Sequence, residues 1–322
     1  MLFTPAVYEH AAKLIGKTPW QVSRSAELLT QAHETAFRTY RHTPVVVGID
    51  VYNLEPEAYG ARVDEPEGFG IPAIREHPCP SVADVIRLKP LDPNTDGRLP
   101  VVIEAASRLK LLLPEADVRI PLSGPFSIAS NLIGFDTLLM EVIVDPDATL
   151  AALHHLVEHE IAIARAAKAH GLGITLFESA ATPPLISPEM FRDVELPALK
   201  KLIADCNHAM GVESACIIGG DTAPVLESLL ETGVGYVICP SETDQHAFME
   251  IMKQHPDVMV RVNMNPEIIS RGNMPEVLAE ADRVFAVAGT RKNVCLGTGV
   301  LPYETDPDVI HKMTAYIASL SV

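Results

Sequence analysis

Short apolar runs alternate with longer helical stretches along this chain, and this alternation constrains the fold more than any other feature. Near-continuous apolar runs are typical of parallel strands that are buried on both faces. Strands that alternate with helices predict βα units around a parallel sheet. The expected strands are Val45–Asp50, Asp117–Ser123, Gly173–Glu178, Glu213–Ile218, Gly235–Cys239, Val258–Val262, Val284–Val287 and Val294–Leu296. We therefore expect an α/β fold, a single (β/α)8 TIM-type barrel over residues 1–322, a length that such barrels commonly reach.

Two segments are additions to a bare barrel. Residues 1–42 precede the first expected strand and are predicted to form a helical extension, in which Thr18 and Pro19 are typical of an N-cap and a first helical position. Residues 51–100 follow that strand as a long insertion rich in proline and glutamate. An insertion at the carboxyl end of a barrel strand usually builds a lid or a binding wall. We expect this insertion to lie at the barrel rim.

Two later helices have clear start signals. Asp145 is the expected cap of a helix that runs to about His170, and Ser187 that of a helix that runs to about Met210. Pro197 should kink the second helix or split it in two, because proline cannot make the internal hydrogen bond.

The charge of the chain restricts its partners. Lys and Arg number 25 against 42 Asp and Glu, which gives a formal net charge of −17 at pH 7. Such an acidic surface argues against nucleic acid or an anionic membrane as the main partner. The five cysteines are widely scattered, and there is no leader-like segment or apolar run of the ~18 residues that a membrane span needs. We expect a reduced, cytoplasmic protein that binds no nucleic acid and no membrane.

In a βα barrel, the residues that bind and react lie where the strands end. Three carboxylates are candidates there: Asp50 and Glu178 end two expected strands, and Asp221 lies just beyond a third. A carboxyl group at the mouth of an apolar strand can have a raised pKa and act as an acid or a base, or it can bind a metal. The alternatives are a turn residue that binds its own backbone, for Asp50, and an ion pair at the barrel rim, for Glu178.

Polar residues and a glycine near the same strand ends are candidates for substrate binding. They are Asn53, Ser123, Gly219, Asn263, Asn265 and Thr298. Asn263 and Asn265 alternate at one strand end, where their amides could donate to a carbonyl, a methoxy oxygen or the edge of a pterin. The alternative for this pair is a loop-forming role before Pro266.

Three segments carry a resemblance to a known family. Leu122–Gly134 (LSGPFSIASNLIG) and Leu185–Phe191 (LISPEMF) resemble the uroporphyrinogen decarboxylase superfamily. Ile217–Leu226 resembles the family element His-x-Cys-Gly-Asp-Thr-x-Pro-x-Leu without gaps. The resemblance extends over about residues 44–318 and implies a barrel fold. The chain looks closer to the corrinoid-dependent methyltransferase branch (methylcobalamin:coenzyme M methyltransferase-like) than to the decarboxylase, because residues 17–24 lack the arginine-rich element that clamps the substrate's carboxylates in the decarboxylase.

In the zinc-dependent methyltransferases of this superfamily, the His and Cys of that element bind zinc together with a Cys near the last strand. The resemblance puts Ile217, Gly219 and Thr298 at these positions, and none of them offers a soft metal donor. Cys216 and Cys295 lie one and three residues away from the expected positions, respectively. A shift of one residue turns a strand side chain to the opposite face, so zinc is uncertain.

A harder, oxygen-rich metal site is a separate alternative. Asp50, Glu178, Asp221 and His246 have suitable donor types, but the sequence gives no ligand spacing that tests such a site.

The resemblance implies a methyltransferase component. Such a protein would move a methyl group between a small methylated substrate, of the methoxy, methylamine or pterin type, and the cobalt of a corrinoid (cobalamin) on a partner protein. On this hypothesis Glu178 or Asp221 protonates the leaving atom, and Asp50 and Asn263 orient the substrate. Without thiol-activating zinc, transfer to a thiol such as coenzyme M is disfavoured.

Two alternatives stay open. One is decarboxylation of the uroporphyrinogen decarboxylase type, and the other is binding of a tetrapyrrole or corrinoid without catalysis, which the absence of the standard ligands would suit. The sequence does not define the oligomeric state, and a homodimer is kept open.

Overall fold

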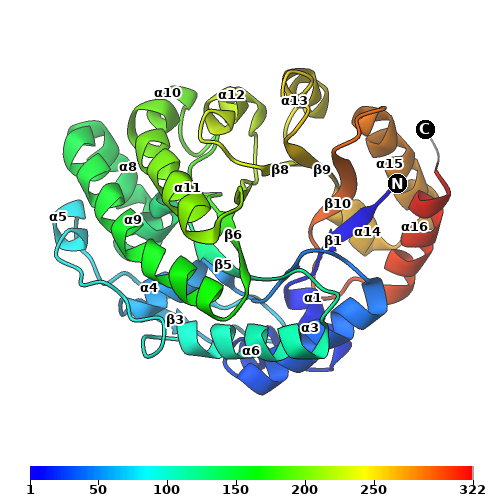
Figure 1. The fold of residues 1–322 in the computed structure, drawn as a ribbon, viewed down its shortest axis with the longest axis horizontal. Helices are drawn as coiled ribbons and strands as arrows, with labels where there is room; N and C mark the ends of the chain where they lie inside the picture. Colours follow the sequence, from blue (N-terminus) through cyan, green and yellow to red (C-terminus); the bar gives the residue numbers. More distant parts are fainter. Residues whose placement is uncertain (321–322) are drawn as a thin grey trace.

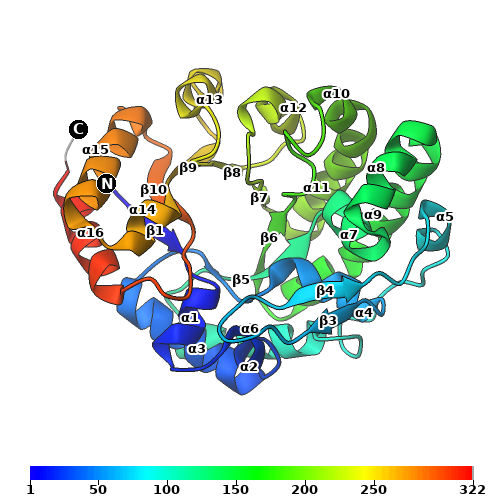
Figure 2. The same cartoon turned by 180° about the vertical axis from the view of Figure 1, so that it is seen from behind.

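Eight parallel strands form one curled sheet in the computed structural model, which describes residues 1–320. In spatial order the strands are β1 (Phe3–Ala6), β10 (Val294–Val300), β9 (Met259–Met264), β8 (Tyr236–Cys239), β7 (Ala215–Ile217), β6 (Gly173–Phe177), β5 (Val118–Ser123) and β2 (Val45–Val46). Helices surround the outside of the curled sheet (Figures 1 and 2). The prediction of an α/β fold of the TIM-barrel type is confirmed.

The two edge strands meet through a side chain. β1 and β2 are not neighbours in the hydrogen-bonded strand order. Instead, the Thr4 hydroxyl donates to the carbonyl oxygen of Thr43 at 2.7 Å and accepts from the Thr43 backbone N–H at 3.3 Å. Thr4 is buried, so these bonds are shielded from water. The threonine therefore bridges the seam at which the sheet curls back on itself.

Two expectations about the strands were wrong. Residues 1–42, predicted to be helical, contain strand β1 as well as helices. Residues 284–287, predicted to be a strand, lie inside helix α15 (Met274–Ala288). Val277, Ala281, Val284 and Ala288 are buried on one side of α15, at the spacing of a helix. The apolar run at 284–287 is therefore the buried part of an amphipathic helix.

Side-chain caps fix several helix starts. The helix expected from Thr18 is divided into α2 (Pro19–Ser23) and α3 (Ala26–Tyr40), because Ser25 accepts from the Leu28 N–H and starts a new helix. The helix expected to begin after Asp145 is α9 (Pro146–Ala169). A π-helical segment (Phe191–Glu195) separates α10 (Pro188–Met190) from α11 (Leu196–Met210), so Pro197 lies in the first turn of α11.

The remaining helices are α1 (Glu9–Leu14), α6 (Leu99–Leu112), α7 (Pro125–Ile133), α8 (Phe135–Val144), α12 (Leu226–Leu230), α13 (Gln245–Met252), α14 (Pro266–Arg271) and α16 (Pro307–Ser319).

The insertion after β2 lies along one side of the mouth of the barrel (Figure 2). It contains a 3₁₀ turn (Val51–Asn53), α4 (Leu54–Ala58), an antiparallel pair of strands, β3 (Arg62–Asp64) and β4 (Ala73–Glu76), and α5 (Val82–Val85). Between the two strands, the Phe69 ring stacks on Tyr303 in the β10–α16 loop, with ring centroids 4.4 Å apart. Figure 2 shows β3 and β4 at the side of the opening formed by the strands.

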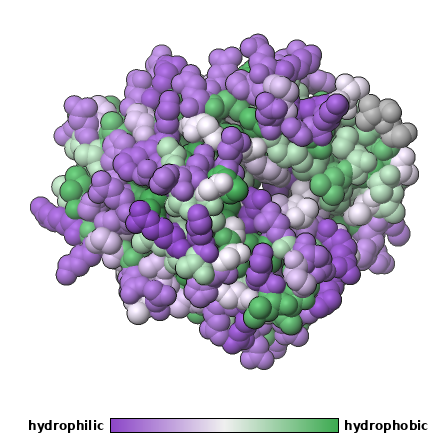
Figure 3. All heavy atoms as spheres, viewed as in Figure 1, coloured by the Kyte–Doolittle hydropathy of each residue, from purple (hydrophilic) through white to green (hydrophobic). Residues whose placement is uncertain are grey.

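The surface and the helix lengths agree with the composition. Purple, hydrophilic side chains dominate the face shown in Figure 3, with apolar groups scattered among them. Within residues 1–320, no single helix is both long and apolar enough to cross a membrane, although the sharply bent pair α7 and α8 meets the same criteria jointly.

Candidate functional site

A cavity of about 500 Å³ opens at the carboxyl ends of the strands. Its walls are formed by Tyr8 and Glu9 after β1, Asp50 after β2, Ser179 after β6, Gly219 after β7, Pro240 after β8, Asn263 in β9 and Gly299 in β10. Residues 71–74 of the insertion supply a further wall. Parallel strands bring their carboxyl ends to the same rim, which is why residues so far apart in sequence meet here.

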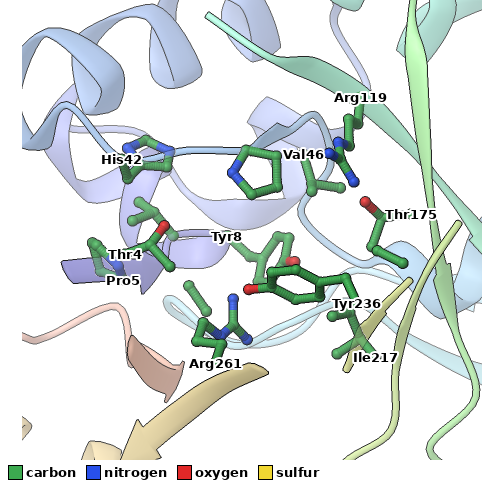
Figure 4. Close-up of a pocket in the computed structure, with 14 residues that line it drawn as sticks. Thr4, Pro5, Tyr8, His42, Val46, Arg119, Thr175, Ile217, Tyr236 and Arg261 are labelled. Atoms are coloured by element: carbon green, nitrogen blue, oxygen red, sulfur yellow. The ribbon is translucent and has the colours of Figure 1, made fainter. Parts of the chain in front are cut away.

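A smaller pocket of about 20 Å³ lies next to this cavity (Figure 4). Ala6, Tyr8, Ile217 and Arg261 line both spaces, so the two adjoin. On the cavity side, Tyr8 and Tyr52 each make an edge-on contact with Phe177, with ring centroids about 6 Å apart (6.1 and 6.0 Å). The inner part of the cavity therefore has an aromatic wall.

Arg261 is a buried cation without a carboxylate partner. Its side chain points from β9 into the barrel, and the residue is only 9% exposed. Its Nε atom donates to Oδ1 of Asn263 at 3.0 Å. No Asp or Glu oxygen within residues 1–320 lies within 4.0 Å of the guanidinium. A buried charge is normally paired, and the described residues give this guanidinium no carboxylate, so its remaining donors face the cavity.

Glu9 is a buried carboxyl group that can exchange a proton near neutral pH. It occupies the first turn of α1, directly after β1, and lines the cavity. Burial raises the pKa of Glu9 to about 7, against the opposing effect of its own backbone N–H, and the charge of Glu304 adds to the rise. A group with this pKa can serve as a general acid or base. Glu9 is not among the residues predicted from the sequence, because strand β1 before it was not predicted; the short run Phe3–Ala6 was the available signal.

Asp50 lines the cavity, but its oxygens are occupied. Arg98 donates to Oδ1 at 3.0 Å and to Oδ2 at 2.7 Å, and Asn53 Nδ2 donates to Oδ2 at 3.0 Å. The Asp50 and Arg98 side chains are 1% and 8% exposed. This buried pair ties the end of β2 to the start of α6, so Asp50 is held as a neutralised anion.

Glu178 lies away from the cavity and binds the start of α7. Its carboxylate accepts from the Phe126 N–H at 3.1 Å, the Ser127 N–H at 2.8 Å and the Ser127 hydroxyl at 2.5 Å. Burial raises the pKa of Glu178 to about 7, and the pKa of its buried neighbour Glu195 well above the ordinary value. We infer that Glu195 stays protonated and donates a hydrogen bond to the Glu178 carboxylate.

A second carboxyl pair has the same design. Glu55 accepts from the Ser123 N–H at 2.7 Å and the Ser123 hydroxyl at 2.8 Å. Burial and the nearby charge of Glu55 raise the pKa of Glu160 well above its ordinary value, so Glu160 is the protonated partner. Ser123, expected to bind substrate, instead fixes Glu55. The Ser123–Ser127 segment thus holds two buried carboxyl pairs.

The other predicted residues divide into two groups. Asn53, Gly219 and Asn263 line the cavity together with Asp50. Asp221, Asn265 and Thr298 do not: Asp221 accepts from the Thr243 hydroxyl at 2.7 Å, Asn265 caps α14, and the Thr298 hydroxyl accepts from the Ala6 N–H at 3.1 Å. Successive residues of a strand face opposite sides of the sheet. Gly297 pairs with the cavity residue Asn263, so the next residue, Thr298, which pairs with Met264, points away from the cavity.

The residues at the superfamily's zinc positions do not fit a zinc site. Ile217 and Gly219 line the cavity without a donor atom. Cys216 and Cys295 are buried and line neither space, and His246 lies on α13, facing a different hollow. No group of three His, Cys, Asp or Glu side chains in the described part of the chain, 1–320, is arranged to hold a metal ion.

The model of one protein family, described as uroporphyrinogen decarboxylase (URO-D), matches residues 3–320. The chain belongs to the uroporphyrinogen decarboxylase family. Among curated relatives, a methylated-thiol–coenzyme M methyltransferase from Methanosarcina mazei is 26% identical over 140 residues, which cover 43% of this chain and 37% of the relative. Among solved structures, a methyltransferase from Methanosarcina mazei aligns with a TM-score of 0.82 at 20% identity, covering 98% of this chain and 91% of that one. This second likeness shows that the family fold is shared.

Proposed function

We propose that this family member is a methyltransferase that moves a methyl group between a small methylated substrate in the cavity and the cobalt of a corrinoid on a partner protein. The observation that carries the proposal is Glu9, a carboxyl group with a pKa of about 7 in the wall of an otherwise largely apolar cavity at the strand ends. The names of the two similar proteins described above, both methyltransferases, agree with it.

The chain's own residues would act on the substrate. When the methyl–heteroatom bond breaks, the heteroatom keeps the electron pair and takes a proton from Glu9. The aromatic wall of Tyr8, Tyr52 and Phe177 packs against the apolar body of the substrate and excludes water. The corrinoid supplies the nucleophilic metal centre that accepts the methyl group. It would reach the substrate through the open mouth, beside the exposed side chains of Ile71 and Val300.

The side chains also narrow the substrate class. Transfer to a thiol needs a metal that stabilises the thiolate, and the residues at 217 and 219 cannot hold one. A methoxy, methylamino or pterin-type methyl group needs only a proton donor for its leaving atom. We therefore favour these three substrate types, with Asn53 and Asn263 as amide groups that orient them.

Decarboxylation of uroporphyrinogen fits the cavity less well. A tetrapyrrole with many carboxylates needs several cations, yet Arg261 is the only Arg or Lys among the described residues that line the cavity. Glu9, Asp50 and Glu242 share the same walls. The balance of charge does not suit a polyanion of that kind.

The test is methyl transfer itself. Purified protein is mixed with cob(I)alamin and, in turn, methoxy, methylamine and methylpterin donors, and formation of methylcobalamin is followed by its absorbance. We expect transfer from one donor type, and a fall of about 10²- to 10⁴-fold in Glu9→Gln, the usual contribution of a general acid. Glu242→Gln, an exposed carboxylate on the same cavity, is the matched control and should retain the rate. Failure of all three donor types, or full activity in Glu9→Gln, would overturn the proposal.

A further inference from the structure

We propose that the cavity binds an anionic ligand, and that the Arg261 guanidinium pairs with a carboxylate, sulfonate or phosphonate group of that ligand. The identification of this ligand as the methylated substrate rests on the proposed function, whereas the prediction that the cavity binds an anion does not. The substrate would then carry an acidic group at the end opposite its methyl group.

The pairing of the other buried arginine makes Arg261 an exception. Arg98 and Arg261 are the arginines that the structure, over 1–320, places among its buried residues. Arg98 binds both Asp50 and Glu57. Arg261 has the Asn263 amide oxygen on Nε and no carboxylate. Leaving a buried guanidinium without an anion is costly, and a guanidinium offers planar, bidentate donors that match carboxylate and phosphonate oxygens.

The surroundings hold the guanidinium at the junction of the two spaces. Asn263 lies on the same face of β9, two residues on, and its oxygen fixes the Nε edge. On the neighbouring strand, a Cβ atom at Gly297 would lie 2.4 Å from Arg261 Cδ, so only glycine leaves room for the arginine stem. This requirement explains the first glycine of the Gly297-Thr-Gly299 sequence.

Two tyrosine hydroxyls complete a donor-rich environment. Figure 4 shows Tyr8 and Tyr236 beside Arg261. Burial raises the pKa of Tyr8 to about 12 and also raises that of Tyr236, while the charge of Arg261 opposes both shifts. Both phenols therefore keep their protons and can act as donors. The Tyr236 hydroxyl is buried and has no oxygen or nitrogen partner within the described chain; its neighbour is the Cys295 thiol, a weak hydrogen-bonding group that an anion would replace.

The nearby carboxylates do not cancel this charge. Asp50 is neutralised by Arg98, and Glu9 has a pKa of about 7, so it is protonated in a large fraction of molecules at neutral pH. The inner end of the cavity is thus locally cationic, although the chain as a whole carries −17. A small anion can enter where a polyanion would meet the acidic outer surface.

The experiment compares isosteric ligands that differ in charge. Binding of methoxyacetate and methoxyacetamide, and of 3-methoxypropanoate and its amide, is measured by calorimetry without corrinoid. We expect the wild type to prefer a carboxylate over its amide by about ten- to hundredfold, the usual contribution of a hydrogen-bonded charge. Arg261→Met should abolish this preference. Arg119→Met is the matched control: Arg119 lines the small pocket too, but it is paired with Asp117, so the preference should persist.

The outcomes separate the two proposals. Equal binding of acid and amide by the wild type, no binding of either pair, or an unchanged preference in Arg261→Met would overturn the anion site. If Arg261→Met does not fold, Arg261→Lys keeps the charge and should retain part of the preference, and the wild-type comparison stands alone. A carboxylate preference in a protein that transfers no methyl group would sustain the anion site and contradict the methyltransferase.

Discussion

Arg98 binds Asp50 through two hydrogen bonds, of 3.0 and 2.7 Å, in a setting where both side chains are almost fully buried. Asp50 follows β2, and Arg98 is the residue before α6, so the pair joins the two ends of the rim insertion. The insertion wall of the cavity is therefore anchored to the barrel by a buried arginine, which also binds Glu57 of α4. Loss of either partner leaves the other charge buried and uncompensated.

We predict that Arg98→Met lowers the free energy of unfolding by about 3–5 kcal/mol, the usual cost of breaking a buried ion pair by removing one partner. Urea denaturation followed by circular dichroism measures the change. Arg62→Met, which breaks the exposed contacts of Arg62 with Asp64 and Glu76 in the same insertion, is the control and should leave stability unchanged. Equal stability of Arg98→Met and the wild type would contradict the anchoring role.

Gly124 is predicted to be intolerant of any side chain. A Cβ atom there would lie 1.9 Å from Oε2 and 2.5 Å from Cδ of Glu178, a group held by three hydrogen bonds. Gly124→Ala should lower the free energy of unfolding by about 3 kcal/mol, as overpacking of a rigid site does. In Gly219→Ala the nearest atom to the new Cβ would be Ser179 Oγ at 3.4 Å, so this control should fold with ordinary stability. A thermal melt of both variants distinguishes the two cases.

The Glu178–Glu195 pair predicts a pH-dependent stability. Because burial raises the pKa of Glu195 well above the ordinary 4.5, the folded protein keeps a proton that the unfolded chain releases. This contribution to stability is complete below about pH 4.5 and is lost as the pH rises through the folded-state pKa, at about 1.4 kcal/mol per pH unit for one retained proton.

Glu195→Gln tests this dependence. Its amide still donates to Glu178 but does not titrate, so the free energy of unfolding should fall less steeply between pH 5 and pH 8 than in the wild type. Urea titrations across this range measure the two slopes. Glu189→Gln, an exposed position on the neighbouring turn, should keep the wild-type slope. Identical slopes in Glu195→Gln and the wild type would show that Glu195 ionises in the folded protein.

The parts of the fold that depend on local periodicity could be predicted from the sequence. The apolar runs at Gly173–Glu178 and Val258–Val262 mark β6 and β9, and the capped helix after Asp145 is α9. Strand ends converge in any βα barrel, so the rim residues Asp50, Asn53, Gly219 and Asn263 could be placed at one cavity.

The roles of the site residues depend on contacts across long stretches of sequence. The sequence predicts Glu178 as an acid at a strand end, but Ser127, 51 positions earlier, donates hydrogen bonds to its carboxylate. β1 is only four residues long, contains Pro5 and pairs with β10 at the other end of the chain. Because this strand was not predicted, Glu9, three residues after its end, was not predicted either. A short buried face of a helix has no periodicity of its own, so the apolar run at residues 284–287 predicts a strand although it lies in α15.

The most direct test of the proposed methyltransferase is the pH dependence of kcat/KM for methyl transfer to cob(I)alamin in the wild type and in Glu9→Gln. Glu9 must carry a proton to act as the acid, and its pKa is about 7. We predict that the wild-type rate falls as the pH rises through about 7, and that Glu9→Gln is slow and lacks this limb. A wild-type limb near pH 7 that persists in Glu9→Gln, or no transfer at any pH, would contradict the account.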